Sequence, residues 1–211
     1  MTDNITGTIS GFNWPAGVAF TPSGAYAYVT DEVSNTVSVI NTLTNKITGT
    51  ISGFQFPAGV SIAPSGAYAY VTDVSTNTVS IVNTSTNKIT GTISGFNWPA
   101  GVAFTPSGAS AYVTNEDNYI SVVNTSTNKI TGTISGFHGP ADVSIAPSGA
   151  YAYVVNYLNN TVSIVSTSTD KITGTISGFQ FPAGVSIAPD GTYAYVTNKD
   201  NSTVSIVGTP S

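Results

Sequence analysis

The chain is built from five near-copies of one unit of about 42 residues, and this repetition restricts its fold more than any other feature. A Gly-Phe pair marks the same point of every unit: Gly11-Phe12, Gly53-Phe54, Gly95-Phe96, Gly136-Phe137 and Gly178-Phe179. Two prolines per unit recur in the same register, and one residue is lost between the third and fourth pairs. A fixed period of this length is typical of solenoids, propellers and repeat arrays.

Four short segments in each unit alternate apolar and polar residues, which predicts β-strands. In the second unit they cover residues 59–63, 68–72, 78–82 and 88–93. Turn residues such as Pro64-Ser65-Gly66 separate the segments, and none has a helical period. We therefore predict an all-β, five-bladed β-propeller with four antiparallel strands per blade, forming one domain over residues 1–211.

The two ends of the chain carry matching parts of one unit. Residues 4–9, Asn-Ile-Thr-Gly-Thr-Ile, match a fourth strand, whereas the last match, residues 203–207, is a third strand. We predict that residues 4–11 complete the last blade and close the ring, which removes an exposed strand edge. Closure within one chain gives a monomer, and exchange of this strand between two chains gives a strand-swapped dimer.

Composition excludes several functions. Charged residues make up 7% of the chain, with 10 acidic residues, five lysines and no arginine, so the clustered basic residues that bind nucleic acid are missing. No run of 18 apolar residues occurs, which argues against membrane insertion. Without cysteine the chain has neither disulfides nor thiol chemistry. We expect no cofactor.

A recurring tetrapeptide ends the second segment of each unit: Tyr28-Val29-Thr30-Asp31, Tyr70-Val71-Thr72-Asp73, Tyr112-Val113-Thr114-Asn115, Tyr153-Val154-Val155-Asn156 and Tyr195-Val196-Thr197-Asn198. This pattern resembles the YVTN-repeat β-propeller family of archaeal surface-layer and bacterial secreted proteins. The resemblance implies a propeller fold and an extracellular or cell-surface location, and it covers nearly the whole chain. Well-known members have seven blades, whereas this chain has five units, whose near-identity points to recent amplification or an engineered array.

The linkers between units contain the first candidate binding residues. An amide precedes an aromatic residue in four of the five linkers: Asn13-Trp14, Gln55-Phe56, Asn97-Trp98 and Gln180-Phe181. Aromatic rings stack on the apolar faces of sugars, and amides both donate to and accept from hydroxyl groups, so these pairs suit a carbohydrate. Alternatively, the aromatics fill the space between blades and the amides satisfy turn backbone.

The fourth linker departs from this pattern. His138 and Gly139 replace the amide and the aromatic residue, and Asp142 stands where the other units have glycine. His138 and Asp142 could form an acid/base pair or bind a metal. A single histidine without cysteine argues against zinc, and divergence of the turn is the simpler interpretation, so we predict no metal site.

One face of the predicted ring is acidic. It receives the linkers and the turns after the second strands, and Lys199 is its only lysine among the acidic residues Asp31, Glu32, Asp73, Glu116, Asp117, Asp142 and Asp200. We expect a protein or a glycan as the partner at this face. Since no catalytic constellation is evident, we predict a non-catalytic cell-surface or extracellular scaffold rather than an enzyme. A multivalent lectin-like module is the alternative, and a lyase or lactonase-type enzyme is least favoured.

Overall fold

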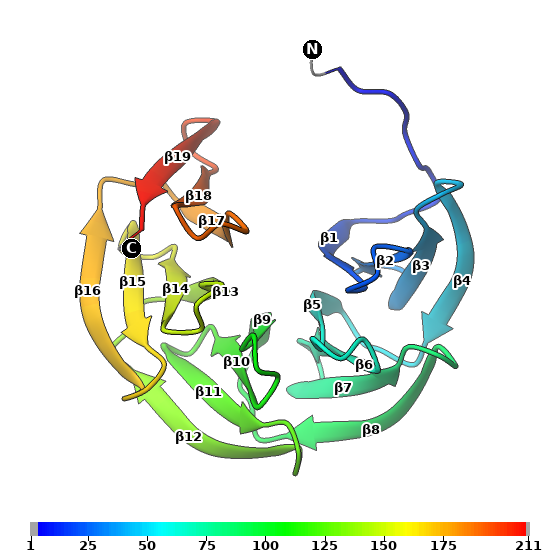
Figure 1. Cartoon of the computed structure of the whole chain (residues 1–211), viewed down its shortest axis with the longest axis horizontal. Coiled ribbons are helices and arrows are strands. Elements are labelled where there is room, and N and C mark those ends of the chain that lie inside the picture. The colour runs from blue at the N-terminus through cyan, green and yellow to red at the C-terminus, as the bar shows by residue number, and fades with distance from the viewer. Residues whose placement is uncertain (1–3, 210–211) are drawn as a thin grey trace.

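The computed structural model describes residues 4–209, which form nineteen strands and no helix. The strands make five small sheets arranged around a centre (Figure 1). Within each sheet the strands are antiparallel and follow one another in chain order, from the innermost strand to the outermost. The predicted all-β, five-bladed propeller is confirmed. No described helix has the length and hydropathy that crossing a membrane would need.

Blade 1 contains β1 (Pro15–Phe20), β2 (Tyr26–Asp31), β3 (Thr36–Asn41) and β4 (Lys46–Ser52). Blade 2 contains β5 (Pro57–Ile62), β6 (Tyr68–Asp73), β7 (Thr78–Asn83) and β8 (Lys88–Ser94). Blade 3 contains β9 (Pro99–Phe104), β10 (Ser110–Asn115), β11 (Tyr119–Asn124) and β12 (Lys129–Ser135). Blade 4 contains β13 (Pro140–Ile145), β14 (Tyr151–Asn156), β15 (Thr161–Ser166) and β16 (Lys171–Ser177). Blade 5 contains β17 (Pro182–Ile187), β18 (Tyr193–Asn198) and β19 (Thr203–Gly208).

Local chemistry fixes the turns between these strands. In the turn after β7, the side-chain oxygen of Asn83 accepts hydrogen bonds from the N–H groups of Ser85 and Thr86, both at 3.0 Å. Asn87 ends this turn with a φ of 52°, a left-handed conformation that asparagine tolerates better than most residues. The Asn-Thr-Ser-Thr-Asn sequence therefore encodes the same turn at residues 83–87 and 124–128.

The hydrophobic core lies between neighbouring blades. Between blades 2 and 3, Tyr70 and Val79 pack in one cluster with Val102 and Phe104. The phenylalanine that follows the linker glycine is buried in each of these interfaces, at Phe54, Phe96, Phe137 and Phe179, whereas Phe12, before the first blade, is half-buried. Apolar residues that alternate along the strands thus face the adjoining blade, which is how a propeller buries both faces of its sheets.

The innermost strands approach one another so closely that they require glycine. A Cβ atom added at Gly59 would lie 2.3 Å from the carbonyl oxygen of Ala100 in blade 3. The hydroxyl group of Thr72 accepts the N–H of Gly59 at 2.7 Å and donates to the same Ala100 oxygen at 2.6 Å. Glycine on the first strand and threonine on the second therefore join blade 1 to blade 2, blade 2 to blade 3 and blade 3 to blade 4.

Blade 5 differs from the prediction because it has three strands. Residues 4–12 belong to no strand, and the Ile5 side chain is 92% exposed. The predicted pairing of residues 4–11 with the last blade is therefore not formed, and a gap separates blade 1 from blade 5 (Figure 1).

Packing between blades explains the open ring. The inner strands are already in contact. In the outer half of the interface between blades 1 and 2, the buried Ile51 and Phe54 pack in one cluster with the partly buried Ile89. Closing five blades would require a wider angle at every interface, which would separate these outer side chains and expose apolar surface. The matching strand sequence at residues 4–9 could not reveal this constraint.

Candidate functional site

A cavity of about 680 Å³ opens where the first strands of the blades converge. Its wall contains small residues contributed by all five blades, because the Ala-Gly pair of each first strand lies there. The exception is Asp142, which places a carboxylate among these small side chains, while Glu32 and Lys199 lie at the rim formed by the turns after β2 and β18. The volume is in the range of small-molecule sites.

The Asp142 carboxylate is held in a fixed orientation. Its Oδ1 accepts the N–H of Val143 and its Oδ2 accepts the N–H of Val185 in blade 5, both at 2.9 Å. Burial raises the pKa of Asp142 to about 6, although both N–H groups favour the charged form. Asp142 can therefore change its protonation state near neutral pH.

A second residue of blade 4, close to Asp142, also departs from the repeat. It lies opposite Val155 in the antiparallel pair of β13 and β14, and Val155 stands where the other blades have threonine. Val155 has no hydroxyl group to join blade 4 to blade 5, and the bond from Val185 to Asp142 supplies a connection instead. Asp142 thus both joins two blades and lines the cavity.

The turns after the second strands surround this mouth of the channel, and they are where the units differ most. Their first residues are Glu32, Val74, Glu116, Tyr157 and Lys199. The residue missing from the repeat is also lost here, in the short turn between Asn115 and Tyr119. Near-identical units therefore place different side chains around one mouth, whereas their other turns remain almost the same.

Apart from the exposed Lys199, these turn residues are partly screened from solvent. Burial raises the pKa of Glu32, and the positive charge of Lys199 opposes this increase, so the two side chains interact across the gap between blades 1 and 5. Burial also raises the pKa of Glu116. The pKa of Tyr157 is raised first by burial and then by the charge of Glu116, which indicates that these two groups are close.

A side cavity of about 320 Å³ adjoins the channel mouth. Its wall includes Glu116, Tyr157, Phe181 and Lys199, and the ring centres of Tyr157 and Phe181 are 5.4 Å apart. A Cβ atom added at Gly139 would lie 2.8 Å from the Tyr157 ring. The fourth linker therefore has glycine where the other linkers have their second aromatic residue, because Tyr157 and Leu158 occupy the adjoining space.

The linker aromatics predicted as ligand-binding residues lie apart, one on each of four linkers. Trp14, Phe56, Trp98 and Phe181 all have positive φ values and remain substantially exposed. Trp14 borders the main cavity, Phe181 borders the side cavity, and Trp98 borders a third cavity of about 230 Å³ together with Asn97. Backbone contacts hold these turns: the Phe56 N–H, for example, donates to the Asn35 side chain at 2.8 Å.

The amide residues anchor the linkers through their backbone. The N–H groups of Asn13, Gln55, Asn97 and Gln180 donate to the side chains of Asp31, Asp73, Asn115 and Asn198, respectively. Asp31 and Asp73 are buried, so their charges belong to these anchors and not to the exposed face. Among the amide side chains, that of Asn97 donates to Asp117 at 2.9 Å.

His138 and Asp142 have different partners. The exposed His138 donates its backbone N–H to Asn156 at 3.2 Å, whereas Asp142 accepts from Val143 and Val185. Within residues 4–209, no three His, Cys, Asp or Glu side chains are grouped as metal ligands. Sequence reasoning identified Asp142 as a candidate and placed Glu116 and Lys199 only on the acidic face. It missed Tyr157, which the variability of this turn could have indicated.

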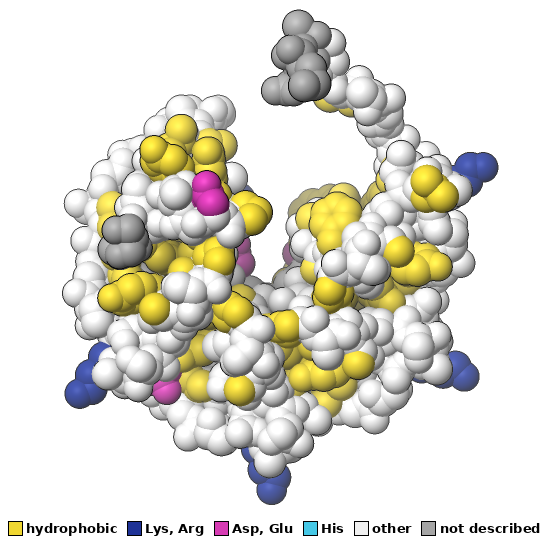
Figure 2. All heavy atoms as spheres, in the orientation of Figure 1, with side chains coloured by type: hydrophobic (Ala, Val, Ile, Leu, Met, Phe, Trp, Pro, Cys, Tyr) yellow, Lys and Arg dark blue, Asp and Glu magenta, His cyan; other side chains and the backbone are white. Residues whose placement is uncertain are grey.

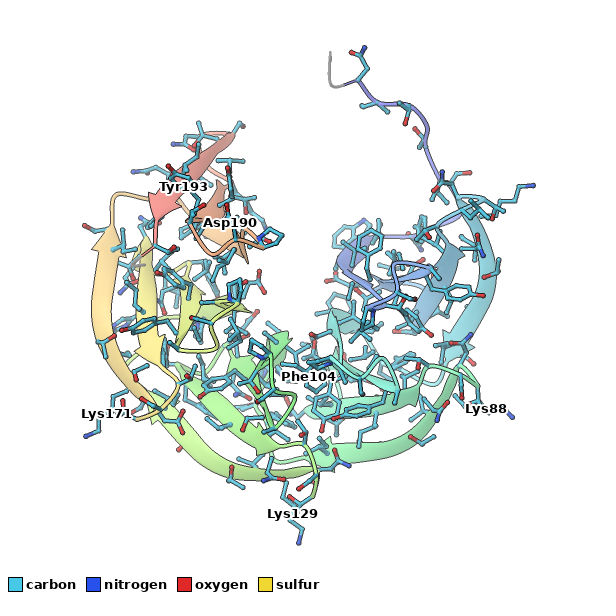
Figure 3. All side chains as sticks on the ribbon, viewed as in Figure 1. Lys88, Phe104, Lys129, Lys171, Asp190 and Tyr193 are labelled. Carbon is cyan, nitrogen blue, oxygen red and sulfur yellow. The ribbon has the colours of Figure 1, made fainter. Side chains whose placement is uncertain are left out.

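The lysines of the outer strands lie away from these cavities. Lys88, Lys129 and Lys171 project outward from the rim of the arc, as Figures 2 and 3 show. Lys199 is therefore the lysine that borders the main cavity and the side cavity in the described part of the chain.

Comparisons with known proteins relate the chain to propellers. The family model described as "Lactonase, 7-bladed beta-propeller" matches residues 15–135 and 102–209. The chain is also similar to a solved structure, Kuenenia stuttgartiensis hydrazine synthase, with a TM-score of 0.84 at 22% identity, over 100% of this chain and 67% of the other. No curated protein matches. The structural likeness, at this identity, concerns the fold alone.

The family match corrects the functional prediction. The non-catalytic scaffold, with its lectin-like alternative, is contradicted, because the matched family is described by an enzymatic activity. The prediction failed because it rested on what the five units share, whereas the residues that make the channel mouth asymmetric differ from one unit to the next. The resemblance to a propeller family is supported, while the extracellular location stays a prediction.

Proposed function

Because the chain belongs to the "Lactonase, 7-bladed beta-propeller" family, we propose that it is an enzyme that hydrolyses a small lactone at the channel mouth. The observation that carries this proposal is Asp142, an oriented carboxylate with a pKa near 6 in the wall of a cavity of about 680 Å³. A group that titrates near the working pH is suited to general base catalysis.

The proposed reaction uses Asp142 to activate water. The carboxylate accepts a proton as the water oxygen attacks the lactone carbonyl carbon and forms the new C–O bond. The ring C–O bond then breaks, and protonated Asp142 returns the proton to the departing ring oxygen. The product is an open-chain hydroxy acid, and Asp142 is regenerated.

Lys199 is proposed to stabilise the negative charge that develops on the carbonyl oxygen. An ammonium group in a partly enclosed site lowers the energy of such a charge more than it would in bulk water. Backbone contacts position this lysine, since its N–H donates to the Phe181 carbonyl at 3.1 Å. The positive charge of Lys199 also acts on the nearby Glu32, whose pKa it lowers against the effect of burial.

The test needs a folded variant that lacks the carboxylate. The double variant Asp142→Gly, Val155→Thr replaces the two residues of blade 4 that depart from the repeat. It restores the glycine and threonine of the other blades and the connection that the threonine hydroxyl group makes. Hydrolysis of a panel of γ- and δ-lactones is measured for the wild type and for this double variant. Proton release in weakly buffered solution monitors the reaction. We expect at least a 100-fold loss of rate, as for removal of a general base.

A second signature is the dependence on pH. Activity of the wild type should increase as the pH rises through about 6, when Asp142 becomes ionised. Equal rates for the wild type and the folded double variant would refute the role of Asp142. Failure of every lactone to react faster than in buffer would refute the proposed activity.

A further inference from the structure

The side cavity adjoins the channel mouth. Ala141, Ala183 and Lys199 border both cavities. A ligand whose reacting group lies beside Asp142 can therefore extend past the blade 5 turn into the side cavity.

One part of the side-cavity wall is aromatic and apolar, while Glu116 and Lys199 supply its charged groups. Tyr157 and Phe181 present two tilted rings, and Ala141, Pro182 and Ala183 complete the lining. The platform is held from both sides: the Phe181 N–H donates to Asn160 at 2.8 Å, and the Tyr157 N–H donates to the Gly139 carbonyl at 3.1 Å. A fixed aromatic platform favours a planar or apolar group over a strongly hydrated one.

Charge around the two cavities is unbalanced. Glu32, Glu116 and Asp142 line them, and Lys199 is the one lysine on their walls. Asp117 adds a further carboxylate in the cavity beside Trp98. In a partly enclosed site, this excess of carboxylates repels an anionic ligand.

On the basis of the proposed lactonase activity, we infer that the side cavity formed by Glu116, Tyr157 and Phe181 is a specificity subsite for an uncharged aryl group of the substrate. The site accordingly selects neutral or cationic aryl lactones and rejects lactones that carry a carboxylate or a phosphate. Tyr157 acts through contact with the aryl group and takes no part in bond breaking.

The test compares two neutral lactones with the same ring size. 3,4-Dihydrocoumarin carries a fused aryl ring, and δ-valerolactone does not. The test variant is Tyr157→Val, which gives blade 4 the residue found at the same position in blade 2. The matched control is Val74→Tyr, which adds a tyrosine at a position that borders neither cavity.

We expect Tyr157→Val to lower kcat/KM for dihydrocoumarin about 10-fold and to change that for δ-valerolactone less than 2-fold. The control should change neither value by more than 2-fold. Comparing each variant with the wild type cancels the different intrinsic reactivities of the lactones. Separately, Glu116→Gln should increase several-fold the ratio of kcat/KM for a δ-lactone that carries a carboxylate to kcat/KM for δ-valerolactone.

A binding measurement separates the two proposals. The lactam 3,4-dihydro-2(1H)-quinolinone resists hydrolysis, and its affinity is measured by NMR titration against that of δ-valerolactam. Tyr157-dependent binding of the aryl lactam without hydrolysis of any lactone would support the subsite and refute the lactonase activity. Hydrolysis with equal effects of Tyr157→Val on both lactones, or no preference for the aryl lactam, would refute the subsite.

Discussion

Equivalent positions of the repeat are buried where two blades are in contact and exposed at the ends of the arc. Tyr70 in blade 2 is 0% exposed, whereas the equivalent Tyr195 in blade 5 is 44% exposed. Val79 and Val204 differ in the same way, at 0% and 56%. Apolar side chains are accordingly visible on both sides of the gap in Figure 2. Identical sequence thus becomes core or surface according to whether a neighbouring blade covers it.

The end of the arc also affects the blade before it. The hydroxyl group of Tyr28 donates to Asn87 at 2.6 Å, and that of Tyr112 donates to Asp170 at 2.5 Å, in each case in the next blade. The equivalent hydroxyl group of Tyr153 is buried and has no hydrogen-bond partner among the described residues. A repeat therefore depends on its neighbour for polar contacts as well as apolar ones.

The largest expected difference between the two regions concerns these tyrosines. Tyr70→Ala removes a fully buried ring and its hydrogen bond to Asn128, and should lower the free energy of unfolding by about 4 kcal/mol. Tyr195→Ala at the open end should cost less than about 1 kcal/mol, because much of the ring is already in water. Urea unfolding measures both. Equal losses would show that blade 5 is covered in solution.

A smaller difference is expected for the glycines of the first strands. Gly59→Ala would bring a Cβ atom to 2.3 Å from the Ala100 oxygen, so the blades must separate, at a cost of about 2 kcal/mol. At Gly184 the nearest atom would be 3.4 Å away, and alanine should change stability by less than about 0.5 kcal/mol. Thermal unfolding should show a decrease of several degrees for the first variant and almost none for the second.

The smallest expected effect distinguishes the interface between blades 4 and 5 from the other three. The pKa of Asp142 is raised by burial from 3.8 to about 6, so its contribution to stability is fully present below pH 4 and is lost as the pH rises through 6. Between pH 5 and pH 7, wild-type stability should fall by about 1 kcal/mol more than that of the Asp142→Gly, Val155→Thr variant. Parallel pH profiles of melting temperature would contradict this assignment.

The strands could be predicted because their signals are local. In blade 2 the expected segments 59–63, 68–72, 78–82 and 88–93 match β5 to β8 to within two residues at each end. Alternation and turn residues determine these limits without reference to the rest of the chain. Closure of the ring could not be predicted in this way, because it depends on the angle at which whole blades pack.

The site was predictable only in part, for a similar reason. Asp142 was noticed because it breaks the repeat, but its contacts are with Val143 and Val185 and not with the neighbouring His138. Tyr157 and Glu116 lie in turns of different blades, and their proximity arises from the ring arrangement. Variation at one turn position marks such residues, although it does not show which of them share a cavity.

The open arc also determines how the chain can fold during synthesis. Every blade consists of consecutive residues. The hydrogen bond from Tyr28 in blade 1 to Asn87 in blade 2 joins residues that are only 59 positions apart in the sequence. Since no strand within residues 4–209 pairs the first blade with the last, no folding step among these residues has to wait for the last blade. Each blade can fold on the previous one as it leaves the ribosome, and the protein grows as a stack to which units can be added.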